Sequence, residues 1–96
     1  MKMTIAECMA SLDEAEAPTG LSLYLTVLWY EKRGDWKQAH EIVQEIDDST
    51  AAWLHAYIHR REGDRDNAAY WYRQAGRPVS SLALDDEWRE IVEALI

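Results

Sequence analysis

The chain has 96 residues, 48% of them hydrophobic, and a formal net charge of −8 at pH 7. This length and apolar content are those of one globular domain rather than of a disordered segment. The excess of acidic side chains argues against nucleic acid as a partner, because phosphate binding requires a concentrated basic face. We therefore expect a single domain over residues 1–96 that binds no nucleic acid.

Cysteine content and hydropathy limit the class of protein further. Cys8 is the one cysteine of the chain, so no internal disulfide can form, which fits a reducing compartment. No segment approaches the ~18 apolar residues that a membrane-spanning helix needs. The N-terminal residues lack the apolar core of a signal peptide. These features predict a cytoplasmic protein with no membrane partner.

Six helices are expected along the chain, and no segment has the two-residue alternation of a strand. Thr4 and Glu7 form a capping box at the start of the first helix. Gly34 and Gly63 each stop a helix, and the aspartate that follows each glycine caps the next one. Ser49 is expected to cap the fourth. The expected helices cover about residues 4–17, 21–33, 35–46, 49–62, 64–75 and 85–95.

Apolar side chains recur at helical spacing and mark the faces that we expect to be buried. In the third helix this stripe contains Trp36, Ala39, Val43 and Ile46. The fourth helix is apolar over most of its circumference, which predicts packing on two flanks. The expected fold is all-α, with about six helices in antiparallel hairpins that form a short solenoid or a bundle.

Two stretches of the chain repeat each other with an offset of 29 residues, the difference between positions 34 and 63. Gly34-Asp35 in the first stretch corresponds to Gly63-Asp64 in the second. Ala39 and Ala68 correspond in the same way. A helix, a Gly-Asp turn and a second helix, used twice, indicate a helical-hairpin repeat.

Over about residues 21–78, this pattern resembles the tetratricopeptide repeat. In that family a small residue in the first helix of each hairpin meets an alanine in the second. Val27 and Ala56 stand at the first of these positions, and Ala39 and Ala68 stand at the second. The resemblance therefore implies two closely packed helical hairpins.

The chain departs from that family in two respects. Its step of 29 residues is shorter than the family's usual ~34. His55 and His59 also stand where the family usually has a large apolar and an aromatic residue. Residues 55–60 and 67–73 are in addition similar to a segment of small bacterial proteins, a resemblance that implies no activity.

The tetratricopeptide resemblance implies a concave surface lined by the first helix of each hairpin. Trp, Tyr and Arg side chains on such a surface are the types that dominate interface energetics. The sequence therefore predicts a protein–protein interaction module or adaptor that holds a peptide or helix of a partner. If the terminal helices fold across the groove, the same residues are core instead. The residues at these positions are Tyr24, Leu28 and Glu31 in the first hairpin, and Trp53, Tyr57 and Arg60 in the second.

The expected partner is a protein or peptide, and an acidic one fits the charge of the centre of the chain. Residues 51–80 carry five arginines against three acidic side chains, whereas both ends of the chain are acidic. Two hairpins are fewer than the ~3 repeats that a stable solenoid usually needs. We therefore expect the first and last helices to act as caps, or a second copy of the chain to stack on an open end as a homodimer.

A pocket around His55, His59 and Tyr70, for a small molecule or a metal ion, is the alternative function. His55, His59 and Glu62 lie at i, i+4 and i+7 on one helix face, and imidazole and carboxylate at that spacing can bind a divalent ion. The zinc-protease motif requires Glu directly after the first His, where this chain has Ala56. No fourth ligand is found nearby, and both histidines can equally be packed core residues. The sequence therefore predicts no metal and no cofactor.

No catalytic constellation stands out. Cys8 shares a helix face with Ile5 and Leu12 and is expected to be a small buried hydrophobe. The serines lack the strand–turn–helix context of an activated nucleophile. The glycines are dispersed, so no phosphate-binding loop is expected. We predict no catalytic residues, and we do not expect an enzyme built on this chain alone.

Overall fold

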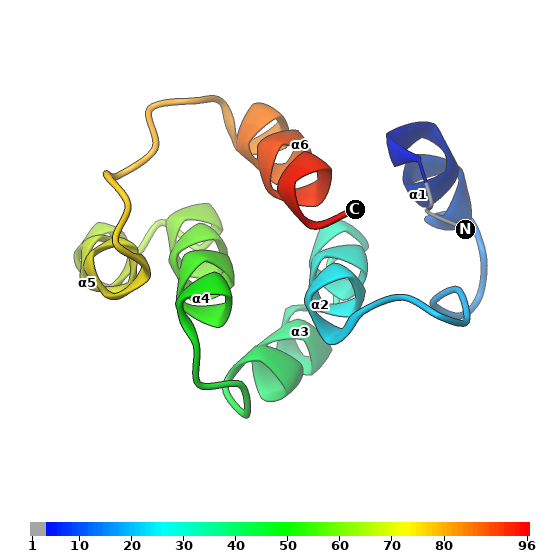
Figure 1. The fold of residues 1–96 in the computed structure, drawn as a ribbon, viewed down its shortest axis with the longest axis horizontal. Helices are drawn as coiled ribbons and strands as arrows, with labels where there is room; N and C mark the ends of the chain where they lie inside the picture. The colour runs from blue at the N-terminus through cyan, green and yellow to red at the C-terminus, as the bar shows by residue number, and fades with distance from the viewer. Residues whose placement is uncertain (1–3) are drawn as a thin grey trace.

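The computed structural model describes residues 4–96, and within that range it contains six α-helices and no strand. This confirms the prediction of an all-α chain. None of these helices is long and apolar enough to cross a membrane. The helices are α1 (Ile5–Ser11), α2 (Leu23–Lys32), α3 (Trp36–Val43), α4 (Ser49–Arg61), α5 (Arg65–Ala75) and α6 (Leu84–Leu95) (Figure 1).

Side-chain caps explain where most of the helices begin. Thr4 and Glu7 form the predicted capping box at the start of α1. Asp35 and Asp64 accept backbone hydrogen bonds at the starts of α3 and α5, as predicted. Asp48, rather than the predicted Ser49, caps α4 by accepting a 2.7 Å hydrogen bond from the backbone N–H of Ala51. Ser49 is instead the first residue of the helix.

The two glycines of the repeat terminate helices in the left-handed conformation. Gly34 has φ +83° and Gly63 has φ +82°. No atom lies within 4 Å of a Cβ built at either position, so space is available and the constraint is the backbone conformation itself. A side chain is strained at such φ values, which is why glycine is favoured there. The prediction that both glycines end a helix is confirmed.

Helix α4 lies at the centre of the molecule. It packs against α5 on one side, against α2 and α3 on another, and also contacts α6 (Figure 1). Every residue from Ala51 to Ile58 is buried as a result. This confirms the prediction that α4 packs on two flanks.

The predicted buried stripe of α3 is only half correct. Ala39 and Val43 are fully buried, but Trp36 is 48% exposed at the first turn of the helix. The helix also ends at Val43, three residues earlier than expected, so Ile46 lies beyond it and is partly buried. Helical spacing does not tell which turns of a helix its neighbours cover, and here it gave the wrong burial for Trp36.

Candidate functional site

The groove implied by the repeat resemblance is covered by the chain's own last helix. Helix α6 contacts both α2 and α4 (Figure 1). The indole Nε1–H of Trp88 on α6 donates a 3.1 Å hydrogen bond to the backbone carbonyl of Leu28 on α2. Leu28, Trp53 and Tyr57 are all buried in this arrangement. None of these three side chains is open to a partner in this arrangement.

Arg60, a further residue predicted to contact a partner, is engaged within the chain. Its Nη1 lies 2.7 Å from Oε1 of Glu87, a fully buried residue of α6, and its Nη2 donates to the carbonyl oxygen of Leu82. The hydroxyl of Tyr72 donates a 2.5 Å hydrogen bond to the other oxygen of Glu87. The guanidinium therefore joins α4 to α6 instead of being free for an incoming carboxylate.

The remaining groove positions also have partners inside the molecule. Tyr24 is partly buried and donates its hydroxyl hydrogen to Asp48. Glu31 is fully buried, with Oε1 2.9 Å from Nε of Arg61. Loss of solvent raises the pKa of the Glu31 carboxyl to about 7, although the charges of Arg61 and Lys32 lower it in part.

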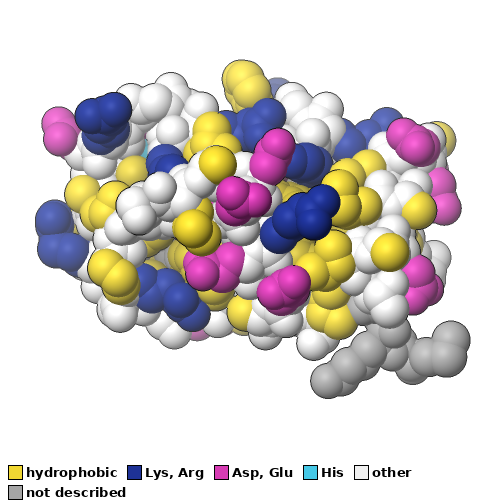
Figure 2. Space-filling view, turned by 90° about the horizontal axis from the view of Figure 1, so that it is seen from above, with side chains coloured by type: hydrophobic (Ala, Val, Ile, Leu, Met, Phe, Trp, Pro, Cys, Tyr) yellow, Lys and Arg dark blue, Asp and Glu magenta, His cyan; other side chains and the backbone are white. Residues whose placement is uncertain are grey.

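The face above α6 offers no single apolar surface either. Figure 2 shows this face, where acidic, basic and apolar side chains are mixed over the surface. The guanidinium of Arg77 lies over the face of the Trp53 indole, with its carbon 3.4 Å from the ring centroid. Arg77 thus shields Trp53, one of the aromatic residues that the repeat pattern had indicated as anchors.

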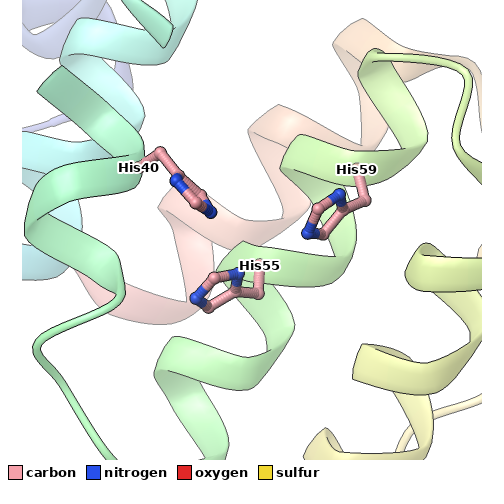
Figure 3. A group of neighbouring side chains, drawn as sticks. All are labelled: His40, His55 and His59. Carbon is pink, nitrogen blue, oxygen red and sulfur yellow. The ribbon is translucent and has the colours of Figure 1, made fainter. Parts of the chain in front are cut away.

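The three histidines of the chain come together at the interface between α3 and α4. His40 projects from α3, and His55 and His59 project from successive turns of α4 (Figure 3). One ring nitrogen from each lies within 4.8 Å of the other two. The ring centroids are 5.3 Å apart for His40 and His55, 5.9 Å for His55 and His59, and 6.1 Å for His40 and His59. The three imidazoles therefore form a nearly regular triangle.

Packing fixes the ring of His55. It lies flat against the indole of Trp71 on α5, with a centroid distance of 4.1 Å and 12° between the planes. Its Nδ1 is buried and has no hydrogen-bond partner among the described residues. Burial first, and then the neighbouring His40 and His59, lower the pKa of His55 to about 4. The ring is thus neutral at pH 7 and has a lone pair available for a metal ion.

The ring of His59 has carboxylates on its outer side. Its Nδ1 lies 3.7 Å from Oε2 of Glu62 and 4.0 Å from Oδ2 of Asp64. Glu62 was predicted to share a ligand face with His55 and His59, but it does not belong to the histidine cluster. Glu62 lies instead near the Nδ1 of His59, which is buried and has no hydrogen-bond partner among the described residues.

Tyr70, the third residue of the predicted pocket, does not belong to the cluster. It is 45% exposed and packs edge-to-face on Trp71, with a centroid distance of 5.2 Å. Tyr70 is therefore linked to the histidines only through Trp71.

Cys8 is buried as predicted, and burial raises the pKa of its thiol.

A cavity of about 370 Å³ lies beside His55. Its walls come from the segment between α3 and α4, the first turns of α4, and α5. His55 and Trp71 both line it, so the buried imidazole is shared between the cluster and the cavity. The side-chain amides of Gln44 and Gln74 and the carboxylate of Asp47 supply polar groups to its wall.

His40 is the residue of this cluster that sequence reasoning missed. The metal-binding alternative weighed in the sequence considered residues of one helix only, and His40 belongs to another. A signal was nevertheless present: His40 directly follows Ala39, and His55 directly precedes Ala56. Both alanines stand at positions where the repeat pattern implies close helix contact, so a histidine beside each one is near a helix interface.

Comparison of the chain with family models, with curated proteins and with solved structures finds no match. The function must therefore be inferred from the geometry of the site itself.

Proposed function

We propose that this protein binds a divalent transition-metal ion through His40, His55 and His59. The observation that supports this most strongly is the approach of the three ligating nitrogens to within 4.8 Å of one another. These residues are also all the histidines that the chain contains. Three imidazoles from two helices at one interface supply the ligand type that transition-metal ions prefer.

The distances favour an ion after only small movements. A tetrahedral zinc ion with Zn–N bonds of about 2.0–2.1 Å places its nitrogen ligands about 3.3 Å apart, so each imidazole nitrogen has to move inward by less than about 1 Å. Rotation of the rings of His40 and His59, which are only partly buried, can supply that movement. His55 is held in place by Trp71 and can act as the fixed point.

The chemistry of the ligands indicates which ions fit. Neutral imidazole suits zinc, copper, nickel and iron, whereas magnesium and calcium prefer oxygen ligands. The low pKa of His55 supports this proposal because no proton has to be removed from that ring at neutral pH. Zinc, with cobalt as a spectroscopic substitute, is therefore the first ion to test.

Titration of the tag-free protein with Co²⁺ and Zn²⁺, followed by absorption and calorimetry, tests this function. We expect one ion per chain. Loss of a group that hydrogen-bonds to a metal ligand typically lowers metal affinity by about 10–100-fold. Loss of a ligand itself should cost more, so replacing His40, His55 or His59 by Ala should lower the affinity by at least about 100-fold. Lys37→Ala, on the exposed side of α3, is the matched control and should leave affinity unchanged. Binding that survives all three histidine substitutions would refute the proposal.

We also infer that α2 to α5 are two tetratricopeptide-like hairpins that serve as the scaffold of this centre. The small residues at the contact positions, Val27, Ala39, Ala56 and Ala68, are at most 2% exposed, which supports this view. An adaptor role would require α6 to leave the groove, against the ion pair of Arg60 with Glu87. For that reason we place metal binding ahead of peptide binding.

A further inference from the structure

Helix α6 is attached to α2 beside a buried carboxyl group. The Nζ of Lys32 on α2 lies 2.6 Å from Oδ1 of Asp85 in the first turn of α6. The backbone carbonyl of Leu28, also on α2, accepts the 3.1 Å hydrogen bond from the indole of Trp88 on α6. Glu31 stands between Leu28 and Lys32 in the chain and is fully buried, and the charge of Asp85 is near enough to raise its pKa. The carboxyl group of Glu31 thus lies next to the contacts that hold α6.

The interior around Glu31 gives an ionised carboxylate little support. Neither of its carboxyl oxygens has a hydrogen-bond partner among the described residues, and the buried hydroxyl of Tyr57 on α4 has none either. Arg61 on α4 supplies a positive charge, with its Nε 2.9 Å from Oε1 of Glu31. A buried carboxylate needs hydrogen bonds as well as an opposite charge to compensate for the loss of water. The site therefore accommodates a protonated, neutral Glu31 more readily than an ionised one.

The charged and titratable groups around Glu31 come from three helices. They are Lys32 on α2, Tyr57 and Arg61 on α4, and Asp85 on α6. Loss of solvent is the largest effect and raises the pKa of Glu31 to about 7, although Arg61 and Lys32 lower it in part. Asp85 raises it further, and the same carboxylate holds the ammonium group of Lys32. Departure of α6 would remove this negative charge and release Lys32, and both changes favour the ionised form of Glu31.

The connection of α6 to the rest of the fold allows this helix to move as a unit. Residues 76–83, which join α5 to α6, form neither a helix nor a strand (Figure 1). An element joined in this way can open locally while the remainder of a domain stays folded. Separation of α6 would uncover the side chains of Trp88, Ile91 and Val92, which are fully buried in the structure.

We propose that α6 is a proton-controlled latch, which stays closed while Glu31 is protonated and opens more often once Glu31 is ionised. In the closed form, the neutral carboxyl group is buried and Asp85 holds Lys32. In the open form, solvent reaches the carboxylate, Lys32 is released, and the apolar face of α6 is exposed. None of the three histidines takes part, so this device is independent of the metal centre proposed above.

Amide hydrogen exchange of the metal-free, full-length chain measures the opening of α6 separately from global unfolding. The backbone amides of Trp88 and Val92 report on α6, and those of Leu54 and Ile58 report on the central helix α4. We expect the α6 amides to exchange before the α4 amides, through an opening of α6 alone. If the open form exposes Glu31 fully, the ratio of open to closed α6 should rise by about 30-fold between about pH 5.5 and about pH 8.5, after correction for the intrinsic exchange rates.

Glu31→Gln should remove this rise, because glutamine has no proton to lose. Glu93→Gln, on the exposed side of α6, is the matched control and should behave as the wild type. A rise in the Glu31 variant equal to that of the wild type would overturn the role of Glu31.

The wild type alone gives two further results, so the test does not depend on the folding of a variant. Opening of α6 that does not change with pH would overturn the control by a proton. Exchange of the α6 amides only together with the α4 amides would overturn the latch, because α6 would then not open on its own. Neither result bears on metal binding by the histidines.

Discussion

The imidazole of His55 stacks on the indole of Trp71, with ring centroids 4.1 Å apart and planes inclined by 12°. The contact joins α4 to α5 and fixes the one histidine of the cluster that is buried. A metal ligand whose orientation is set before the ion arrives loses less side-chain freedom on binding. Trp71 thus connects the fold of the second hairpin to the geometry of the centre.

Replacing Trp71 by Leu should weaken metal binding by about tenfold, since the ring of His55 would lose the partner that holds it. Calorimetric titration with Zn²⁺ measures this change. Val79→Ala is the control, because Val79 is an exposed apolar residue in the segment between α5 and α6. Equal affinities for the two variants would mean that Trp71 does not position His55.

Glu62 should act on the metal only through His59. Its Oε2 lies 3.7 Å from Nδ1 of His59, and that leaves Nε2 of the ring for the ion. Because Asp64 is a second carboxylate nearby, Glu62→Gln should lower zinc affinity by no more than about tenfold. A loss as large as that of His59→Ala would instead identify Glu62 as a direct ligand. The titration that measures the histidine variants distinguishes these outcomes.

Arg60→Glu should destabilise the protein strongly. The substitution would leave the buried carboxylate of Glu87 without its cation and place a second negative charge beside it. Breaking a buried ion pair in this way typically costs about 3–5 kcal/mol. Chemical denaturation measures the loss, and Arg73→Glu on the exposed side of α5 serves as the control. Wild-type stability in the Arg60 variant would show that α6 is not held over the groove by this pair.

The buried carboxyl of Glu31 should make stability depend on pH. Its pKa rises from 4.5 to about 7 on folding, so the folded state holds a proton that the unfolded state releases between these values. The contribution of this bound proton to the free energy of unfolding is therefore complete below about pH 4.5. It is lost as pH rises through 7, and the loss is up to about 3 kcal/mol. Arg61, Lys32, Tyr57 and Asp85 are the charged or titratable groups that act on it.

Glu31→Gln isolates this effect, because glutamine has no proton to lose. The lowered pKa of His55 has the opposite effect, because it adds stability as pH rises from about 4 to 6.5. His55 is present in both the wild type and the Glu31→Gln variant, so its effect cancels in the difference between them. The difference in unfolding free energy between variant and wild type should therefore change with pH in favour of the variant. Parallel curves from pH 4 to pH 8 would contradict the raised pKa of Glu31.

Local features of this fold were predictable from the sequence. The Thr4–Glu7 capping box, the Asp caps and the left-handed glycines depend on residues within a few positions of one another. The same holds for the apolar circumference of α4, which indicated a central helix. Such signals are read directly from spacing and residue type.

Long-range features were not predictable in the same way. The docking of α6 depends on contacts such as Trp88 with Leu28, which are 60 residues apart in the chain. The histidine cluster depends on how α3 packs against α4, and a search of one helix face finds Glu62 in place of His40. Both depend on how helices pack against one another, and spacing within a single helix does not determine that.

Nuclear magnetic resonance of protein labelled with ¹⁵N in its histidine rings tests the metal centre most directly. The chain has three histidines, so every ring signal belongs to the proposed site. On addition of Zn²⁺, we predict that one nitrogen of each of the three rings shifts, and that all three changes are complete at one equivalent. Shifts confined to one or two rings, or shifts that continue well beyond one equivalent, would contradict a centre formed by His40, His55 and His59.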